Sequence, residues 1–222
     1  MCRSLGWIAP ENPRDDSDGG FYVRKLDSRR SWGVGLFLVV ATLGLMLVMG
    51  RQGAPLDRRD PVEGKRADRD VRNILDLEFA RTEERTVYIR SVWGEEGMRT
   101  ARVNIAIDYL YLFAYGSLLA LAVRRSAGWL ALHPASGIRR LGRLGRFFAL
   151  VPVAGAALDA VENFAMLRML APSFSGDRWP GLAAQCAGIK FNLIYATAAW
   201  LVLAAVLSAP PQSKEEQGHP VI

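Results

Sequence analysis

Two carboxylates and an amide interrupt an apolar part of the chain. Asp159, Glu162 and Asn163 lie within residues 147–170, which are otherwise apolar except for Arg168. On a helix these three residues share one face, because they are three or four positions apart. Two poorly solvated carboxylates one turn apart do not both ionise readily, so we expect one to be protonated or paired with a base. Such a group can bind a ligand, an ion or a proton, act as an acid and base pair, or join helices by hydrogen bonds.

Two other apolar runs carry polar residues that could join this group. Residues 103–123 hold Asp108, Tyr111 and Tyr115 on one helical face with Asn104, and residues 187–207 hold Lys190 and Asn192. Lys190 lies roughly 200° around its helix from Asn192. We therefore expect Lys190 to extend to the membrane interface, with a pair to Glu162 as the alternative. The candidate polar centre comprises Asp108, Tyr111, Tyr115, Asp159, Glu162, Asn163 and Asn192, with Lys190 as a secondary candidate.

Four apolar runs are long enough to carry these side chains through a membrane. They are residues 32–50, 103–123, 147–170 and 187–207, and each is close to the roughly 20 residues that a transmembrane helix needs. A charge that faces lipid costs at least about 2.5 kcal/mol, so the polar groups should face the inside of a bundle. The sequence therefore predicts an all-α integral membrane bundle of four transmembrane helices.

The segments between and beyond these runs are polar. Residues 1–31 and 209–222 are predicted to be polar tails, the first of them disordered, and residues 51–70 a charged linker. In residues 71–102 apolar side chains recur at helical spacing while charges occupy the other faces. This pattern predicts an amphipathic interfacial helix or helix pair, which either lies on the membrane surface or caps the bundle.

The distribution of charge predicts the location and the orientation of the chain. The net charge is +6, and the connection 124–146 holds six arginines and no acidic residue. Arginine-rich loops beside membrane spans explain this balance better than nucleic-acid binding, so the expected partner is the lipid bilayer and not a nucleic acid. We predict the cell inner (cytoplasmic) membrane, with both termini and the 124–146 connection in the cytoplasm. Whichever orientation is right, the helical rise places six polar residues within roughly 17 Å of the side that carries residues 51–102: Asp108, Asp159, Glu162, Asn163, Lys190 and Asn192.

The composition favours some functions over others. There are only two cysteines, one in a polar tail and one near a span, and the two histidines lie outside the spans, so the sequence predicts no disulfide framework, metal site or cofactor. Because no nucleophile–base arrangement is recognisable, the first hypothesis is a protein whose polar centre binds a small ligand, lipid headgroup or ion, or fixes the bundle. A membrane-embedded enzyme that acts on a lipid or amphiphile through paired carboxylates is the alternative. A proton- or ion-coupled transport component is a third hypothesis, which would require a homo-oligomer or a partner membrane protein because four spans are few for a transporter.

Three segments together resemble a group of small bacterial four-span membrane proteins. They are the amphipathic Leu75-Asp76-Leu77-Glu78-Phe79-Ala80, the segment from Ile107 to Tyr115, and Ala157-Leu158-Asp159-Ala160-Val161-Glu162-Asn163. The resemblance covers roughly residues 70–207. It implies the four-span architecture and the importance of these residues, and it implies no activity.

Overall fold

The structure is a computed structural model that describes residues 17–56, 71 and 73–208, with side chains from residue 32 onward. All the regular elements of these ranges are helical. Four stretches are long and apolar enough to cross a membrane: Trp32–Leu56, Glu83–Ala131, Ser136–Met169 and Arg178–Ser208. The prediction of an all-α chain with four candidate membrane spans is therefore confirmed.

The first helix, α1 (Ser17–Gly53), is followed by a short 3-10 helix, η1 (Ala54–Leu56). Residues 17–31, which the sequence placed in a polar tail, are part of α1, whereas residues 1–16, 57–70 and 209–222 lie outside the described residues. The chain forms two compact units, residues 1–37 and 38–222. In the first unit Trp32, Leu36 and Phe37 expose their side chains.

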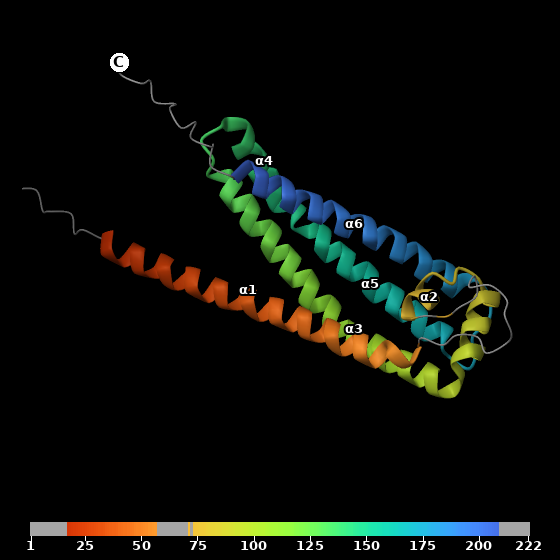
Figure 1. Cartoon of the computed structure of the whole chain (residues 1–222). Helices are drawn as coiled ribbons and strands as arrows, with labels where there is room; N and C mark the ends of the chain where they lie inside the picture. The colour runs from red at the N-terminus through yellow and green to blue at the C-terminus, as the bar shows by residue number, and fades with distance from the viewer. Residues whose placement is uncertain (1–16, 57–70, 72, 209–222) are drawn as a thin grey trace, which may run out of the picture. The chain divides into compact units, whose positions relative to one another are not determined.

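In the second unit, three helices lie side by side: α3 (Glu83–Ala131), α5 (Leu150–Met169) and α6 (Arg178–Ser208) (Figure 1). Helix α5 packs against both α3 and α6. The fourth predicted span began at residue 187, whereas α6 already begins at Arg178, so Lys190 and Asn192 lie more than three turns inside the helix. The bundle can thus hold both residues away from its ends.

Where α3 and α6 end, α4 (Ser136–Phe148) packs against α3 (Figure 1). The sequence treated residues 124–146 as a connection, but α3 continues to Ala131 and most of the remainder is helical. The helices approach closely at Gly142, where an added Cβ would lie 2.6 Å from the carbonyl carbon of Leu130. A side chain at this position would therefore separate α4 from α3.

At the opposite end, residues 71–102 fold onto the bundle. Here α2 (Ile74–Glu78) begins at a capping box, in which Asn73 Oδ1 accepts a hydrogen bond from the Leu75 amide and Asp76 Oδ2 accepts one from the Asn73 amide. Such a box satisfies amide groups that a helix start leaves free. The core at this end joins η1, α2, α3, α5 and α6 through buried side chains that include Leu56, Leu77, Ile89, Trp93, Met169, Leu170 and Ala183. The segment packs as a cap on the bundle, and its position at a membrane interface stays a prediction.

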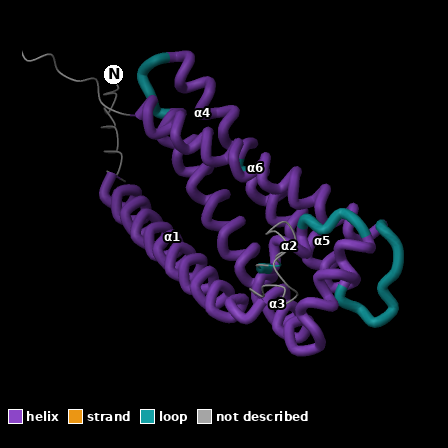
Figure 2. Tube along the Cα trace, turned by 45° about the vertical axis from the view of Figure 1, so that its right-hand side comes forward, coloured by secondary structure: helices purple, strands orange, loops and turns teal. Residues whose placement is uncertain are grey.

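Gly94 changes the direction of α3. Its φ of 60° and ψ of −170° are not helical, and essentially only glycine adopts this combination. The first turns of α3, up to Gly94, run across the end of the bundle, and the remaining turns run along the bundle (Figures 1 and 2). Beside the break, Trp93 Nε1 donates a hydrogen bond of 3.2 Å to the Leu56 carbonyl. The interruption thus lets one helix supply both part of the cap and a wall of the bundle.

Candidate ligand cavity

Lys190 of α6 is the centre of a buried ionic cluster. Its Nζ lies 2.9 Å from Asp159 Oδ1 and 2.8 Å from Glu162 Oε2, both on α5, and 3.1 Å from Glu78 Oε1 on α2. The four residues expose between 1% and 6% of their surface. Because charge is strongly destabilised away from water unless it is paired, each of these groups depends on the others.

The cluster extends to α3 through a tyrosine. Tyr115 donates a hydrogen bond of 2.9 Å from its hydroxyl to Asp159 Oδ2, so both oxygens of this carboxylate are occupied. The ring of Tyr111 packs against that of Tyr115, with 5.2 Å between the centroids. Asp159 is therefore held between a tyrosine of α3 and a lysine of α6, which fixes its orientation.

A second polar pair lies beside the ionic cluster. Asn163 Nδ2 of α5 donates a hydrogen bond of 2.6 Å to Asp108 Oδ2 of α3. The amide nitrogen of Asn163 is the atom that faces Asp108, as suits a carboxylate that accepts hydrogen bonds. The other amide atom, Asn163 Oδ1, is buried and has no hydrogen-bond partner among the described residues. A buried acceptor left in this way is costly and points to a partner outside the described residues.

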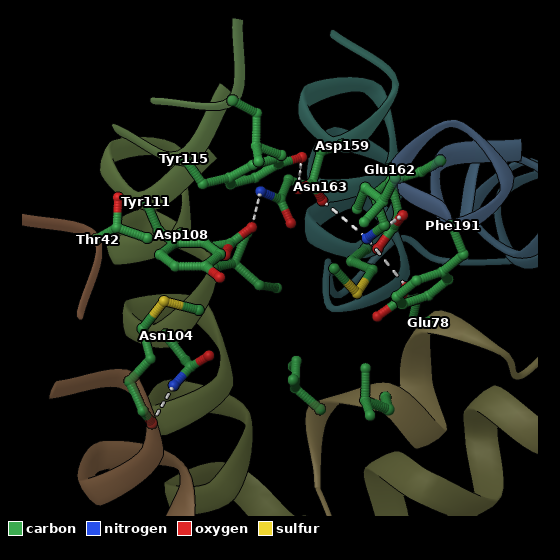
Figure 3. Close-up of a pocket in the computed structure, with 18 of the residues that line it drawn as sticks. Thr42, Glu78, Asn104, Asp108, Tyr111, Tyr115, Asp159, Glu162, Asn163 and Phe191 are labelled. Atoms are coloured by element: carbon green, nitrogen blue, oxygen red, sulfur yellow. Dashed lines mark hydrogen bonds and ion pairs between the residues drawn. The ribbon is translucent and has the colours of Figure 1, made fainter. Parts of the chain in front are cut away.

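Both groups line one cavity of about 420 Å³. Figure 3 shows Asp108, Asn163, Asp159 and Glu162 around its polar side. Its apolar lining comes from five elements and comprises Met49, Ile74, Leu75, Ile105, Leu118, Leu119, Met166, Phe191 and Ile194. This volume lies within the roughly 300–1,000 Å³ that is usual for small-molecule sites.

The cavity has more acidic than basic side chains. Its lining includes four carboxylates, from Glu78, Asp108, Asp159 and Glu162, and one ammonium group, from Lys190. Among the residues that the structure describes, no three His, Cys, Asp or Glu side chains are placed so that they could hold a metal ion. Three carboxylates around one ammonium group leave an excess of negative charge in a poorly solvated site, which favours a proton or a further cation there.

The structure brings most of the predicted residues together. Asp108, Tyr111, Tyr115, Asp159, Glu162 and Asn163 all line the cavity. Asn192 does not join them, because its side chain is exposed and donates to the Gly188 carbonyl of its own helix. Lys190, which we expected to extend to the interface, instead lies inside the cluster; its pair with Glu162 was the alternative. The two residues do lie on different faces of α6, but the inward face was assigned to the wrong residue.

Sequence reasoning missed Glu78 and the role of Asn104. Glu78 follows Val71 and Ile74 on one face of the amphipathic segment, and a carboxylate within an apolar stripe is the signal that could have identified it. Asn104 donates a hydrogen bond of 3.0 Å to the Met49 carbonyl and so ties the end of α1 to α3 (Figure 3). Glu78 in particular shows that the cap contributes to the cavity.

In fold, the described chain is a helical bundle with four helices that could cross a membrane, built around a mixed polar and apolar cavity. No protein-family model, no curated protein and no solved structure matches the chain. The function is therefore inferred from the geometry of the cavity.

Proposed function

We propose that this protein is a multi-pass protein of the cytoplasmic membrane that binds a small amphiphilic molecule in the cavity between α1, α2, α3, α5 and α6. The observation that carries the proposal is the division of the cavity into an apolar and a polar side. Leu118, Leu119 and Ile194 can take up a hydrocarbon tail, and Asp108 and Asn163 can bind a polar head. A ligand with both parts would donate to Asn163 Oδ1, which has no partner among the described residues, without exposing apolar surface to water.

A binding role fits the carboxylates better than the catalytic hypothesis. Asp159 and Glu162 are the residues that an acid and base pair would use, but both are engaged by Lys190. Asp159 is in addition bonded to Tyr115. These contacts support a role in shaping the cavity.

The proposal is tested by cross-linking with decyl-chain amphiphiles that carry a diazirine at the tail, with the protein in phosphatidylglycerol nanodiscs. We expect saturable labelling that maps to Leu118, Leu119 and Ile194. Leu118→Trp should fill the apolar side and reduce this labelling by about tenfold, since it blocks the tail. Leu110→Trp is the matched control, because Leu110 is on the same helix but is 63% exposed.

The contrary result is also clear. The cavity does not bind amphiphiles if no decyl-chain probe labels it saturably, whether the head of the probe is an alcohol or an amine. The same holds if Leu118→Trp and Leu110→Trp reduce labelling equally. Labelling of all lipid-facing surfaces that increases linearly with probe concentration would likewise show that the cavity does not bind amphiphiles.

A further inference from the structure

The head of the amphiphile can be assigned a chemical class from the polar side of the cavity. We propose that Asp108 and Asn163 form a subsite for a primary ammonium group; this inference rests on the proposed function. The subsite is formed by two helices, since Asp108 belongs to α3 and Asn163 to α5.

The first argument is the set of free acceptors. Asp108 has no ion pair with a cationic side chain in the described part of the chain, and its hydrogen bond comes from the neutral Asn163. Asn163 is 1% exposed, and its Oδ1 is an acceptor without a donor among the described residues. Figure 3 shows the two side chains facing each other at the edge of the cavity. A primary ammonium group carries three donors and no acceptor, so it complements this arrangement.

The second argument is charge. Lys190 is the cation that faces the subsite from α6, but Glu78, Asp159 and Glu162 surround its Nζ within 3.1 Å. Those carboxylates exceed the charge of Lys190, so the subsite does not repel a further cation. An anionic head would instead meet Asp108 beside three other carboxylates of the lining, which disfavours it.

The third argument separates an organic cation from a metal ion. A hard metal ion takes six or more oxygen ligands or keeps several waters, whereas the described residues offer no cluster of three or more metal-binding side chains. The apolar lining beside Asp108 offers no ligand to a bare ion, whereas it can contact the tail of an alkylamine.

The experiment compares three diazirine probes with the same decyl tail and different heads: a primary ammonium, a trimethylammonium and a hydroxyl. The protein is again held in phosphatidylglycerol nanodiscs. We expect the primary ammonium probe to bind at least about tenfold more tightly than the other two, the effect of a hydrogen bond to a charged group. Equal affinity of the ammonium and hydroxyl probes would overturn the ammonium subsite while the proposed function stands. Absence of saturable binding by all three would overturn both.

Two variants locate the effect. Asp108→Asn keeps an oxygen that can accept from Asn163 and should therefore fold, but it should remove the preference for ammonium over hydroxyl. Asn163→Leu should weaken ammonium binding about tenfold by removing the free acceptor. Glu95→Gln is the charge control, because Glu95 is exposed on α3 and does not line the cavity. If Asp108→Asn and Asn163→Leu both bind the ammonium probe like the parent protein, the subsite is wrong.

Competition distinguishes the source of the ammonium group. Phosphatidylethanolamine added to the nanodiscs should displace the probe if the natural ligand is a lipid headgroup. Displacement by free decylamine alone would identify a small alkylamine. Each of these two results supports the subsite, and displacement by neither would contradict it.

Discussion

At the scale of single residues, Lys190 determines how the interior is held together. One ammonium group makes three ion pairs, and their partners come from two different helices. Burying an ion pair is not by itself a large gain in stability, because both charges lose their hydration. Removing one member of such a cluster strongly destabilises a protein, because the remaining charges stay buried without a partner.

We therefore predict that Lys190→Met strongly destabilises the protein. The loss in the free energy of unfolding should be about 3–5 kcal/mol, because Glu78, Asp159 and Glu162 lose their shared cation. The measurement is equilibrium unfolding in mixed micelles. Arg99→Gln removes a positive charge from an exposed site on α3 and should change stability by less than about 0.5 kcal/mol. Equal effects of the two substitutions would mean that the cluster is not important for stability.

At the scale of elements, the interruption of α3 determines where the cap lies. A continuous helix from Glu83 to Ala131 would carry its first turns beyond the bundle, whereas Gly94 turns them across its end. The cap is then fastened by local contacts, such as the 2.6 Å hydrogen bond from the Glu83 amide to Asp177 in the loop before α6. It is also through this folding back that Glu78 of α2 reaches Lys190.

Two glycines of α3 should respond differently to replacement by alanine. Gly94→Ala should destabilise the protein by about 1–3 kcal/mol, because alanine is strained at this φ and ψ. Gly128→Ala should be neutral or stabilising by up to about 1 kcal/mol, since Gly128 is helical and an added Cβ meets nothing within 4 Å. Thermal unfolding of both variants in the same detergent checks this. A loss at Gly128 as large as that at Gly94 would contradict the conformational argument.

At the scale of the whole molecule, the two ends of the bundle differ in chemistry. One end carries the cap and the cavity, and its core is formed by residues such as Trp93 and Met169. The other end carries α4, which packs on α3 through Gly142. The arginine side chains of α4 are exposed: Arg139, Arg140, Arg143 and Arg146. Exposed arginines beside membrane spans are typical of the cytoplasmic side, so we propose that α4 faces the cytoplasm and the cap faces outward.

Topology reporters test this orientation. Fusions at residues 60 and 177 should report the outer side, and a fusion at residue 135 should report the cytoplasm, because Ala135 precedes α4 and Asp177 precedes α6. Reporter activity in cells is the measurement. A fusion at 135 that reports the same side as the one at 177 would contradict the four-span arrangement, and a complete inversion would contradict the orientation alone.

The sequence alone determined the class of the fold and most of the polar centre. Runs of apolar residues long enough to cross a membrane have few alternatives to a helix, because every backbone polar group must be satisfied within the segment. Within such runs charged residues must face inward, and the helical repeat places Asp159, Glu162 and Asn163 on one face. Both the helical spans and the inward polar face can be predicted from the periodicity of the sequence and from the free-energy cost of exposing charge to lipid.

The tertiary structure alone decided which helices meet and which residues close the cavity. The pairing of Lys190 with Glu78 joins positions 112 residues apart, and it depends on a turn at Gly94 that the sequence indicates only as a break. The rotation of α6 decides that Lys190 points inward while Asn192 stays exposed. Helical periodicity gives the angle between two residues of one helix but not the direction of that helix's neighbours, which packing sets.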